Sequence, residues 1–218
     1  MGTHNPYPKM ENRMQLRLRN VVLACLVTSG AFAAAPAAAH EAGDWLLKAG
    51  VTHVNPKSDN GDVLGNVQLD VGNSTRPSLS ITYMATRNIG VELLGAFPFK
   101  HDIGAKGLGN IGSTKHLPPT LSLQWHFLPD ARVQPYVGVG LNYTTFFSTK
   151  SSLGDLDLAD SWGVAGQLGV DVKLNERWFL NADMRYIDIS SKVKLNGQRI
   201  GKAQIDPWVA TVGVGYRF

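Results

Sequence analysis

The chain has 218 residues, 44% of them hydrophobic, and a formal net charge of +4. This composition excludes a disordered chain, and no uncharged run of about 18 apolar residues follows residue 40, so no transmembrane helix is expected there. Residues 1–39 carry +3 of the net charge, which leaves +1 on the rest. The basic isoelectric point is therefore no indication of nucleic-acid binding.

Residues 1–39 are predicted to be an N-terminal extension and a cleavable signal peptide. Three arginines precede an apolar stretch at 21–35, and Ala37-Ala38-Ala39 has the small-residue pattern that signal peptidase cleaves. We place cleavage before His40, so that residues 40–218 form the mature domain. An uncleaved anchor is the alternative, which the short apolar stretch disfavours.

After residue 43, apolar and polar residues alternate with a period of two, which predicts β-strands. The segments run about ten residues or more, the length that crosses a bilayer at a tilt. They begin near Asp44, Ser78, Ile89, His116, Pro135, Ser161, Trp178 and Ile205. The pattern predicts an all-β fold, an eight-stranded antiparallel transmembrane β-barrel of the outer membrane.

The connections between these segments alternate in length. Short turns are expected near 86–88, 128–134 and 175–177, and long loops at 55–77, 100–115, 148–160 and 190–204. Short turns at one end and long loops at the other are typical of outer-membrane barrels, whose long loops are extracellular. A soluble sandwich has no reason to sort its loops in this way.

The final segment has the clearest two-faced pattern. One face is apolar with aromatic ends, and the other is small or polar. We expect the apolar face to contact lipid and the other to line the lumen. The apolar face holds Trp208, Ala210, Val212, Val214, Tyr216 and Phe218, and the other holds Val209, Thr211, Gly213, Gly215 and Arg217.

Aromatic residues are expected in two girdles around this apolar band. Core aromatics of a soluble sandwich are the alternative, but these need not gather at both ends of strands. The periplasmic girdle is predicted to hold Trp45, Trp125, Trp178, Tyr83, Tyr136 and Tyr216, and the outer one Trp162, Trp208, Phe97, Tyr143 and Tyr186.

From His40 onward the sequence resembles the OmpW family. The resemblance is carried by the blocks His40-Glu41-Ala42-Gly43-Asp44, Thr82-Tyr83-Met84-Ala85-Thr86, Asn88-Ile89-Gly90-Val91-Glu92-Leu93-Leu94, His116-Leu117-Pro118-Pro119-Thr120, Tyr136-Val137-Gly138, Asn142-Tyr143-Thr144-Thr145-Phe146-Phe147, Asp206-Pro207-Trp208 and Gly215-Tyr216-Arg217-Phe218. It implies a monomeric eight-stranded barrel in the Gram-negative outer membrane, associated with passage of small hydrophobic molecules and with channel activity. The terminal Phe218 resembles the signal that the barrel-assembly machinery reads.

Charged and polar residues are expected to form a layer across the lower lumen. An eight-stranded barrel is barely wider than its side chains, so such charges must be paired or hydrated. A mutually paired plug is the favoured interpretation, and an ion pathway is the alternative. The expected members are Lys48, Glu92, Gln124, His126, Asp171, Lys173, Asp183, Arg185 and Arg217.

The upper lumen is expected to be apolar, which packing alone does not require. We interpret it as a hydrophobic funnel that is closed below by the polar layer, so that a captured molecule leaves sideways into the membrane. Pro118 and Pro119 mark a candidate lateral opening, because proline removes ladder donors; alternatively they merely begin a strand. The funnel residues are Leu94, Ala96, Phe146, Ile187, Ile189 and Val209.

These patterns favour passive uptake of small hydrophobic molecules by a barrel that is embedded in outer-membrane lipids. The alternatives are a structural or receptor barrel that binds through its loops and a small ion-conducting channel. An enzyme is not expected, because the histidines suggest no nucleophile–base–orienter set. No cofactor or metal is expected, because the histidines are scattered and Cys25, the single cysteine, lies in the leader.

Overall fold

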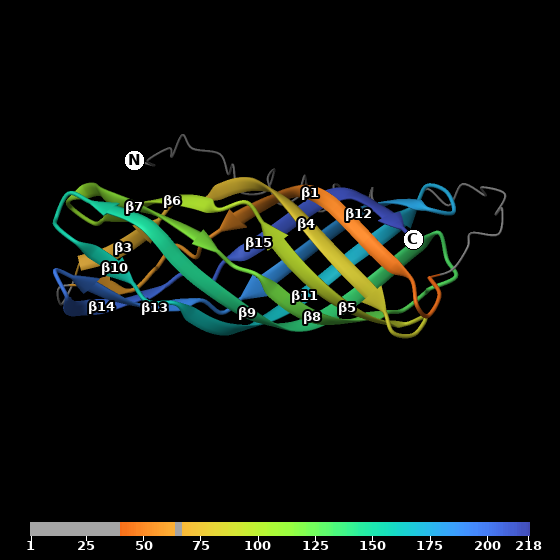
Figure 1. Cartoon of the computed structure of the whole chain (residues 1–218). Coiled ribbons are helices and arrows are strands. Elements are labelled where there is room, and N and C mark those ends of the chain that lie inside the picture. Colours follow the sequence, from red (N-terminus) through yellow and green to blue (C-terminus); the bar gives the residue numbers. More distant parts are fainter. Residues whose placement is uncertain (1–39, 64–66) are drawn as a thin grey trace, which may run out of the picture. The chain divides into compact units, whose positions relative to one another are not determined.

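The computed structural model describes residues 40–63 and 67–218, so the predicted signal peptide lies outside the described residues. Within them, eight strands form a closed antiparallel barrel in which the last strand pairs with the first (Figure 1). No helix in these ranges is long and apolar enough to cross a membrane. The predicted barrel fold is confirmed. Its strands are β1 (Trp45–Asn55), β4 (Ser74–Met84), β5 (Ile89–Ala96), β8 (Thr120–His126), β9 (Val133–Ser151), β11 (Ser161–Lys173), β12 (Trp178–Ile187) and β15 (Trp208–Arg217).

The predicted long loops are largely strands, and this part of the prediction was wrong. They pair with one another beyond the barrel, and they join the barrel sheet through the long strand β9, which pairs with β7 (Figure 1). We call this part the extension. Apolar side chains of these strands pack inside the extension around Leu69, Ile103 and Val193. The strands are β2 (Asp62–Val63), β3 (Val67–Val71), β6 (Phe99–Ala105), β7 (Gly109–Leu117), β10 (Leu156–Leu158), β13 (Ser190–Leu195) and β14 (Gln198–Gln204).

Prolines account for two strand boundaries that the sequence analysis misplaced. The fourth barrel strand begins at Thr120, not near His116, because Pro118 and Pro119 interrupt the chain and His116 belongs to β7. The eighth begins at Trp208, directly after Pro207. Proline has no N–H to donate to a ladder, so regular pairing resumes only after it.

The barrel wall has an apolar exterior and a mixed interior, as the alternation predicted. On β9, Val137, Val139 and Leu141 are exposed, whereas Asn142 and Thr144 are buried. Exposed apolar residues continue around the wall on the other barrel strands, which is typical of a barrel that crosses a bilayer. We call the end with short connections the turn end.

Aromatic pairs mark both ends of this apolar belt. Trp45 contacts Tyr83 and Trp178 contacts Tyr216 at the turn end, and Tyr143–Trp162 and Tyr186–Trp208 lie at the other, with ring centroids 4.8–5.3 Å apart. Tyr136 was wrongly placed in a girdle. It is 1% exposed and stacks on His126 inside the barrel, as its parity opposite to Val137 requires.

Two glycines on the inner wall allow large rings to lie across the narrow lumen. A Cβ atom on Gly169 would meet the ring of Tyr136, and one on Gly215 would meet the ring of Phe179. The rings therefore fill the space over bare backbone and pack the lower lumen.

Candidate functional site

A buried carboxylate, Glu92, lies inside the barrel between two cations. It extends inward from β5, Lys48 from β1 and Arg185 from β12. Lys48 Nζ is 2.6 Å from Glu92 Oε2, and Arg185 Nη2 is 2.6 Å from Glu92 Oε1. Arg185 Nε also donates to Asp183 Oδ1 at 2.9 Å. The four side chains form one ion-pair cluster across the lumen, which we call the Glu92 cluster.

Amide side chains extend this cluster toward the turn end. Gln167 donates to Glu92 at 3.4 Å, and Gln124 donates to Gln167 at 3.2 Å. His126 contacts Gln124 at 3.3 Å, and Asn181 donates to Asp171 at 2.7 Å. The polar residues therefore form a nearly continuous hydrogen-bonded layer.

Two residues expected in this layer lie near its edge instead of its centre. Arg217 Nη1 is 3.4 Å from Asp44 Oδ2, and Lys173 Nζ donates to the Pro129 carbonyl at 3.2 Å. Both contacts lie beside the short connections at the turn end. The other expected members lie within the hydrogen-bonded layer. They are Lys48, Glu92, Gln124, His126, Asp171, Asp183 and Arg185.

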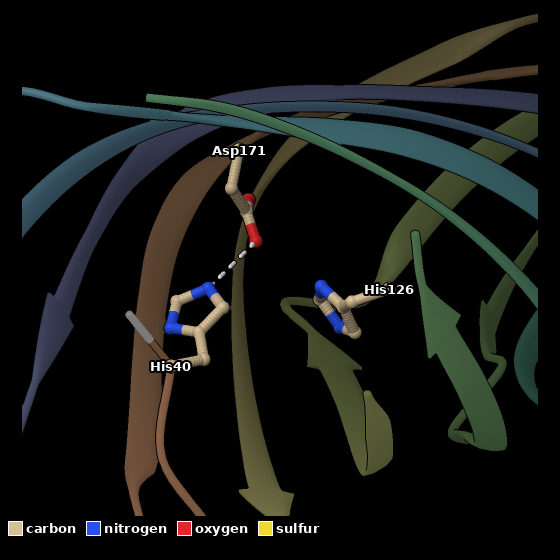
Figure 2. Close-up of side chains that lie close together, drawn as sticks. All are labelled: His40, His126 and Asp171. Atoms are coloured by element: carbon tan, nitrogen blue, oxygen red, sulfur yellow. Dashed lines mark ion pairs between the residues drawn. The ribbon is translucent and has the colours of Figure 1, made fainter. Parts of the chain in front are cut away.

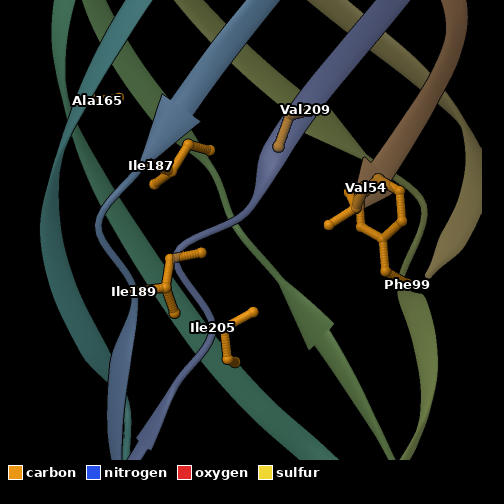
Figure 3. Close-up of a cluster of buried hydrophobic side chains, with 7 residues drawn as sticks. All are labelled: Val54, Phe99, Ala165, Ile187, Ile189, Ile205 and Val209. Carbon is orange, nitrogen blue, oxygen red and sulfur yellow. The ribbon is translucent and has the colours of Figure 1, made fainter. Parts of the chain in front are cut away.

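The apolar residues expected in the upper lumen come together there. Ile187, Ile189 and Val209 pack with Val54, Phe99, Ala165 and Ile205 (Figure 3). Ala96 and Phe146 pack against this group, and Leu94 lines the same space. The remaining cavity is only about 10 Å³, so side chains nearly fill this level.

A more open apolar cavity lies in the extension, where the sequence analysis expected loops. Its volume is about 40 Å³ and its lining is almost wholly apolar, with Leu69, Ile103, Val193 and Phe146 among its residues. The period-two alternation at Val67, Leu69 and Val71 was the available signal for these inward positions. The apolar interior therefore reaches further from the membrane than expected.

Two stacked histidines lie where this cavity meets the upper lumen. The rings of His101 and His116 are 4.7 Å apart, and His116 lines both cavities. Burial lowers the pKa of His116 to about 3, with a further contribution from His101, and burial also lowers the pKa of His101. Both rings are therefore neutral near pH 7 and compatible with an apolar passage.

The backbone ladder is interrupted beside Pro118 and Pro119. Pairing of β5 with β8 ends at Leu94–Thr120, and pairing of β6 with β7 resumes at Phe99–His116. No pairing joins 95–98 to 117–119 in this described part of the wall. On the other side, Pro119 O accepts from Tyr143 N at 3.1 Å, so the interruption faces β5 and β6 only.

We predict that Glu92→Gln destabilises the barrel by about 3–5 kcal/mol, because Lys48 and Arg185 are then buried without their shared anion. Urea unfolding in lipid vesicles, followed by tryptophan fluorescence, measures the effect. Glu176→Gln, in an exposed turn, is the control and should change stability by less than about 0.5 kcal/mol. Equal effects of the two substitutions would contradict the role given to the Glu92 cluster.

Acidification should loosen the extension through His116. The pKa of His116 is about 3 when the ring is buried and about 6.5 when it is exposed. Between these pH values, the locally opened extension binds more protons than the closed one, so a fall in pH favours opening of the extension. When the pH falls from 7.5 to 5, the equilibrium constant for opening of the extension should increase up to roughly 30-fold. Hydrogen exchange of β6 and β7 amides, corrected for intrinsic rates, checks this, and His116→Gln should reduce the increase. Equal protection at both pH values would refute it.

Comparison with known proteins assigns the chain to a family. The OmpW family model matches residues 41–218. Outer membrane protein W of Salmonella typhi is 44% identical over 210 residues, covering 91% of this chain and 96% of that protein. The Pseudomonas aeruginosa protein PahQ, named for a dibenzothiophene metabolism operon, is 25% identical, covering 89% of this chain and 97% of that protein.

A solved structure supports the same assignment. The crystal structure of the outer membrane protein OprG from Pseudomonas aeruginosa is similar with a TM-score of 0.74 and 35% identity, covering 83% of this chain and 98% of that chain. With the closed barrel and its apolar belt, these similarities place the chain as an integral protein of the Gram-negative outer membrane. The chain belongs to the OmpW family of outer-membrane proteins.

Proposed function

We propose that this barrel takes up small hydrophobic molecules passively, capturing them in the extension and releasing them sideways into the outer membrane. The observation that carries the proposal is the apolar interior, which runs from the extension cavity past His116 to Leu94 and then ends at the Glu92 cluster. Transfer of an apolar molecule from water into the apolar interior is favourable. Its passage through the Glu92 cluster is unfavourable, because it would have to separate buried charges.

Capture requires the extension cavity to widen around its ligand. The narrow lining consists mainly of aliphatic side chains from several strands, which can move apart to admit an unbranched or flat apolar molecule. Ligand sites of this kind are mostly apolar with few polar groups. The name of PahQ, which links that relative to dibenzothiophene metabolism, agrees with an apolar ligand.

Release sideways is supported by the interrupted ladder. Pro118, Leu94 and Ala96 line the upper lumen directly beside the unpaired segments. Separating 95–98 from 117–119 breaks no ladder pair, so the wall can open there without losing backbone hydrogen bonds between strands. Where the eight barrel strands are paired, as along β1 and β15, opening has to break the ladder between them.

The experiment measures uptake of radiolabelled dodecane by intact cells, per folded barrel in the outer membrane. Phe146→Arg should lower uptake by more than about tenfold, because an unpaired charge in an apolar cavity costs several kcal/mol. Gln198→Arg, on an exposed position of β14, is the matched control and should retain uptake. Unchanged uptake with Phe146→Arg would refute capture in this cavity.

A second variant separates release from capture. Pro118→Ala combined with Pro119→Ala restores two backbone N–H groups. Because Pro119 pairs with Tyr143 on the β9 side, the N–H at 118 faces β5 and β6 in an extended strand and should close the interruption. This should lower uptake without changing the binding of dodecane to the purified barrel. Loss of both dodecane binding and uptake would mean that the prolines contribute to capture. Unchanged uptake would exclude lateral release beside Pro118 and Pro119.

The conduit acts as a monomer in this proposal. A closed barrel has no free strand edge within the membrane, so a single chain satisfies its own backbone. Exposed Phe218, whose N–H donates to Trp45 O at 2.9 Å, is the proposed signal for the barrel-assembly machinery. The second candidate function is a receptor role for the extension. If every lumen variant retained uptake, this role would be favoured.

A further inference from the structure

Three potential metal ligands converge inside the barrel at its turn end (Figure 2). They are His40, which precedes β1, His126 at the end of β8, and Asp171 on β11. One ligand atom from each lies within 4.8 Å of the others, and all three residues are at most 1% exposed. The scattered sequence positions concealed this group, because the three residues come from three separate segments.

A tight turn brings His40 into the barrel. The Glu41 N–H donates to Asp44 Oδ2 at 2.8 Å, and the Asp44 N–H donates to Glu41 O at 3.2 Å. Gly43 has a φ of 98°, which a residue with a side chain rarely adopts, and its N–H donates to Met84 O. The turn folds the chain back on itself and directs the imidazole of His40 toward Asp171.

The neighbouring amides leave specific atoms free to bind a cation. His126 Nε2 donates to Gln124 Oε1 at 3.3 Å, which leaves the lone pair of Nδ1. Asn181 donates to Asp171 Oδ1 at 2.7 Å, which leaves Oδ2. Second contacts of this kind orient histidine and carboxylate ligands in metal sites.

The free atoms have no hydrogen-bond partner among the described residues. They are both ring nitrogens of His40, Nδ1 of His126 and Oδ2 of Asp171, although His40 Nε2 lies 3.9 Å from Asp171 Oδ2. Buried polar atoms normally have partners, so four without one in a single cluster indicate a missing ligand.

Aromatic packing is the simpler account of the same side chains. The ring of His40 lies edge-on to His126 at 5.5 Å and to Phe179 at 6.0 Å. This packing explains where the rings lie, but it satisfies none of the four polar atoms. Apolar side chains at the same positions would pack as well without that cost.

We propose that His40, His126 and Asp171 bind one divalent transition-metal ion of the class that prefers imidazole and carboxylate ligands, represented by Zn²⁺. Ligand atoms bound tetrahedrally at about 2.0–2.2 Å lie about 3.4 Å apart, so small side-chain rotations have to close the group. Lys48, a buried cation of the same polar layer, is paired with Glu92 and so does not oppose binding strongly.

The bound ion would attach the segment before β1 to two strands of the opposite wall. His40 then becomes a fixed part of the polar layer, and the turn end is closed by metal coordination in addition to hydrogen bonds. This role does not depend on the uptake proposal, since it concerns the turn end and not the apolar interior.

The test uses full barrel purified from outer membranes in detergent and stripped with EDTA. Titration with Co²⁺, followed by visible absorption, should show one bound equivalent that Zn²⁺ displaces. His40→Gln and Asp171→Asn should each weaken binding by more than about tenfold, the loss that even supporting residues of metal sites cause. His53→Gln, at an exposed histidine of β1, should bind as the unmodified protein does.

Heat-dependent migration in gels verifies that each variant remains a folded barrel. Absence of one-to-one binding overturns the proposal, as does binding that survives both His40→Gln and Asp171→Asn. Loss of binding with His116→Gln instead would assign the metal to the histidine pair of the extension and equally exclude this site.

Discussion

The pairing of Glu92 with Lys48 and Arg185 is the interaction on which the interior of this barrel depends. An eight-stranded barrel has little room for water, so an inward charge requires a partner across the lumen. One carboxylate holds two cations from β1 and β12 at 2.6 Å each, and Asp183 supports the second cation. These contacts join distant strands across the lumen.

The apolar interior beyond the Glu92 cluster follows a different physical rule. Strands outside the membrane are surrounded by water, so they turn their apolar faces inward and build a core within the extension. The same side chains stabilise the extension and line its cavity. In the proposed uptake, the stability of the extension and ligand capture would draw on one set of residues, with the His101–His116 pair at its lower boundary.

The sequence was sufficient to predict the barrel because the period of two distinguishes its two faces. It placed Glu92, Asp171 and Arg185 inward, and it indicated the interruption at Pro118. The predicted loops nevertheless pair into strands, and β6–β7 and β13–β14 are hairpins of neighbouring segments. The alternation at Val67, Leu69 and Val71 was a local signal for such strands, but it is too short to distinguish a strand from a loop by itself. Tyr136 was misplaced although the pattern was sufficient. It directly precedes the outward-facing Val137, so strict alternation would have placed it inside the barrel.

The convergence of His40 with His126 and Asp171 was equally invisible. It depends on the turn at Gly43 and on the register of β8 and β11, which bring together residues more than 40 positions apart. Ligand sets that span a barrel lumen lack the short spacings by which metal sites are recognised in sequences.

We propose that apolar molecules enter the extension and stop above the Glu92 cluster. A crystal structure of the barrel soaked with a long-chain alkane would show whether the alkane binds in the extension. We expect alkane density in the cavity lined by Leu69, Ile103 and Phe146, reaching toward Pro118, with the Glu92 ion pairs intact. Alkane density passing through separated Glu92 ion pairs, or an extension that excludes alkane, would contradict it.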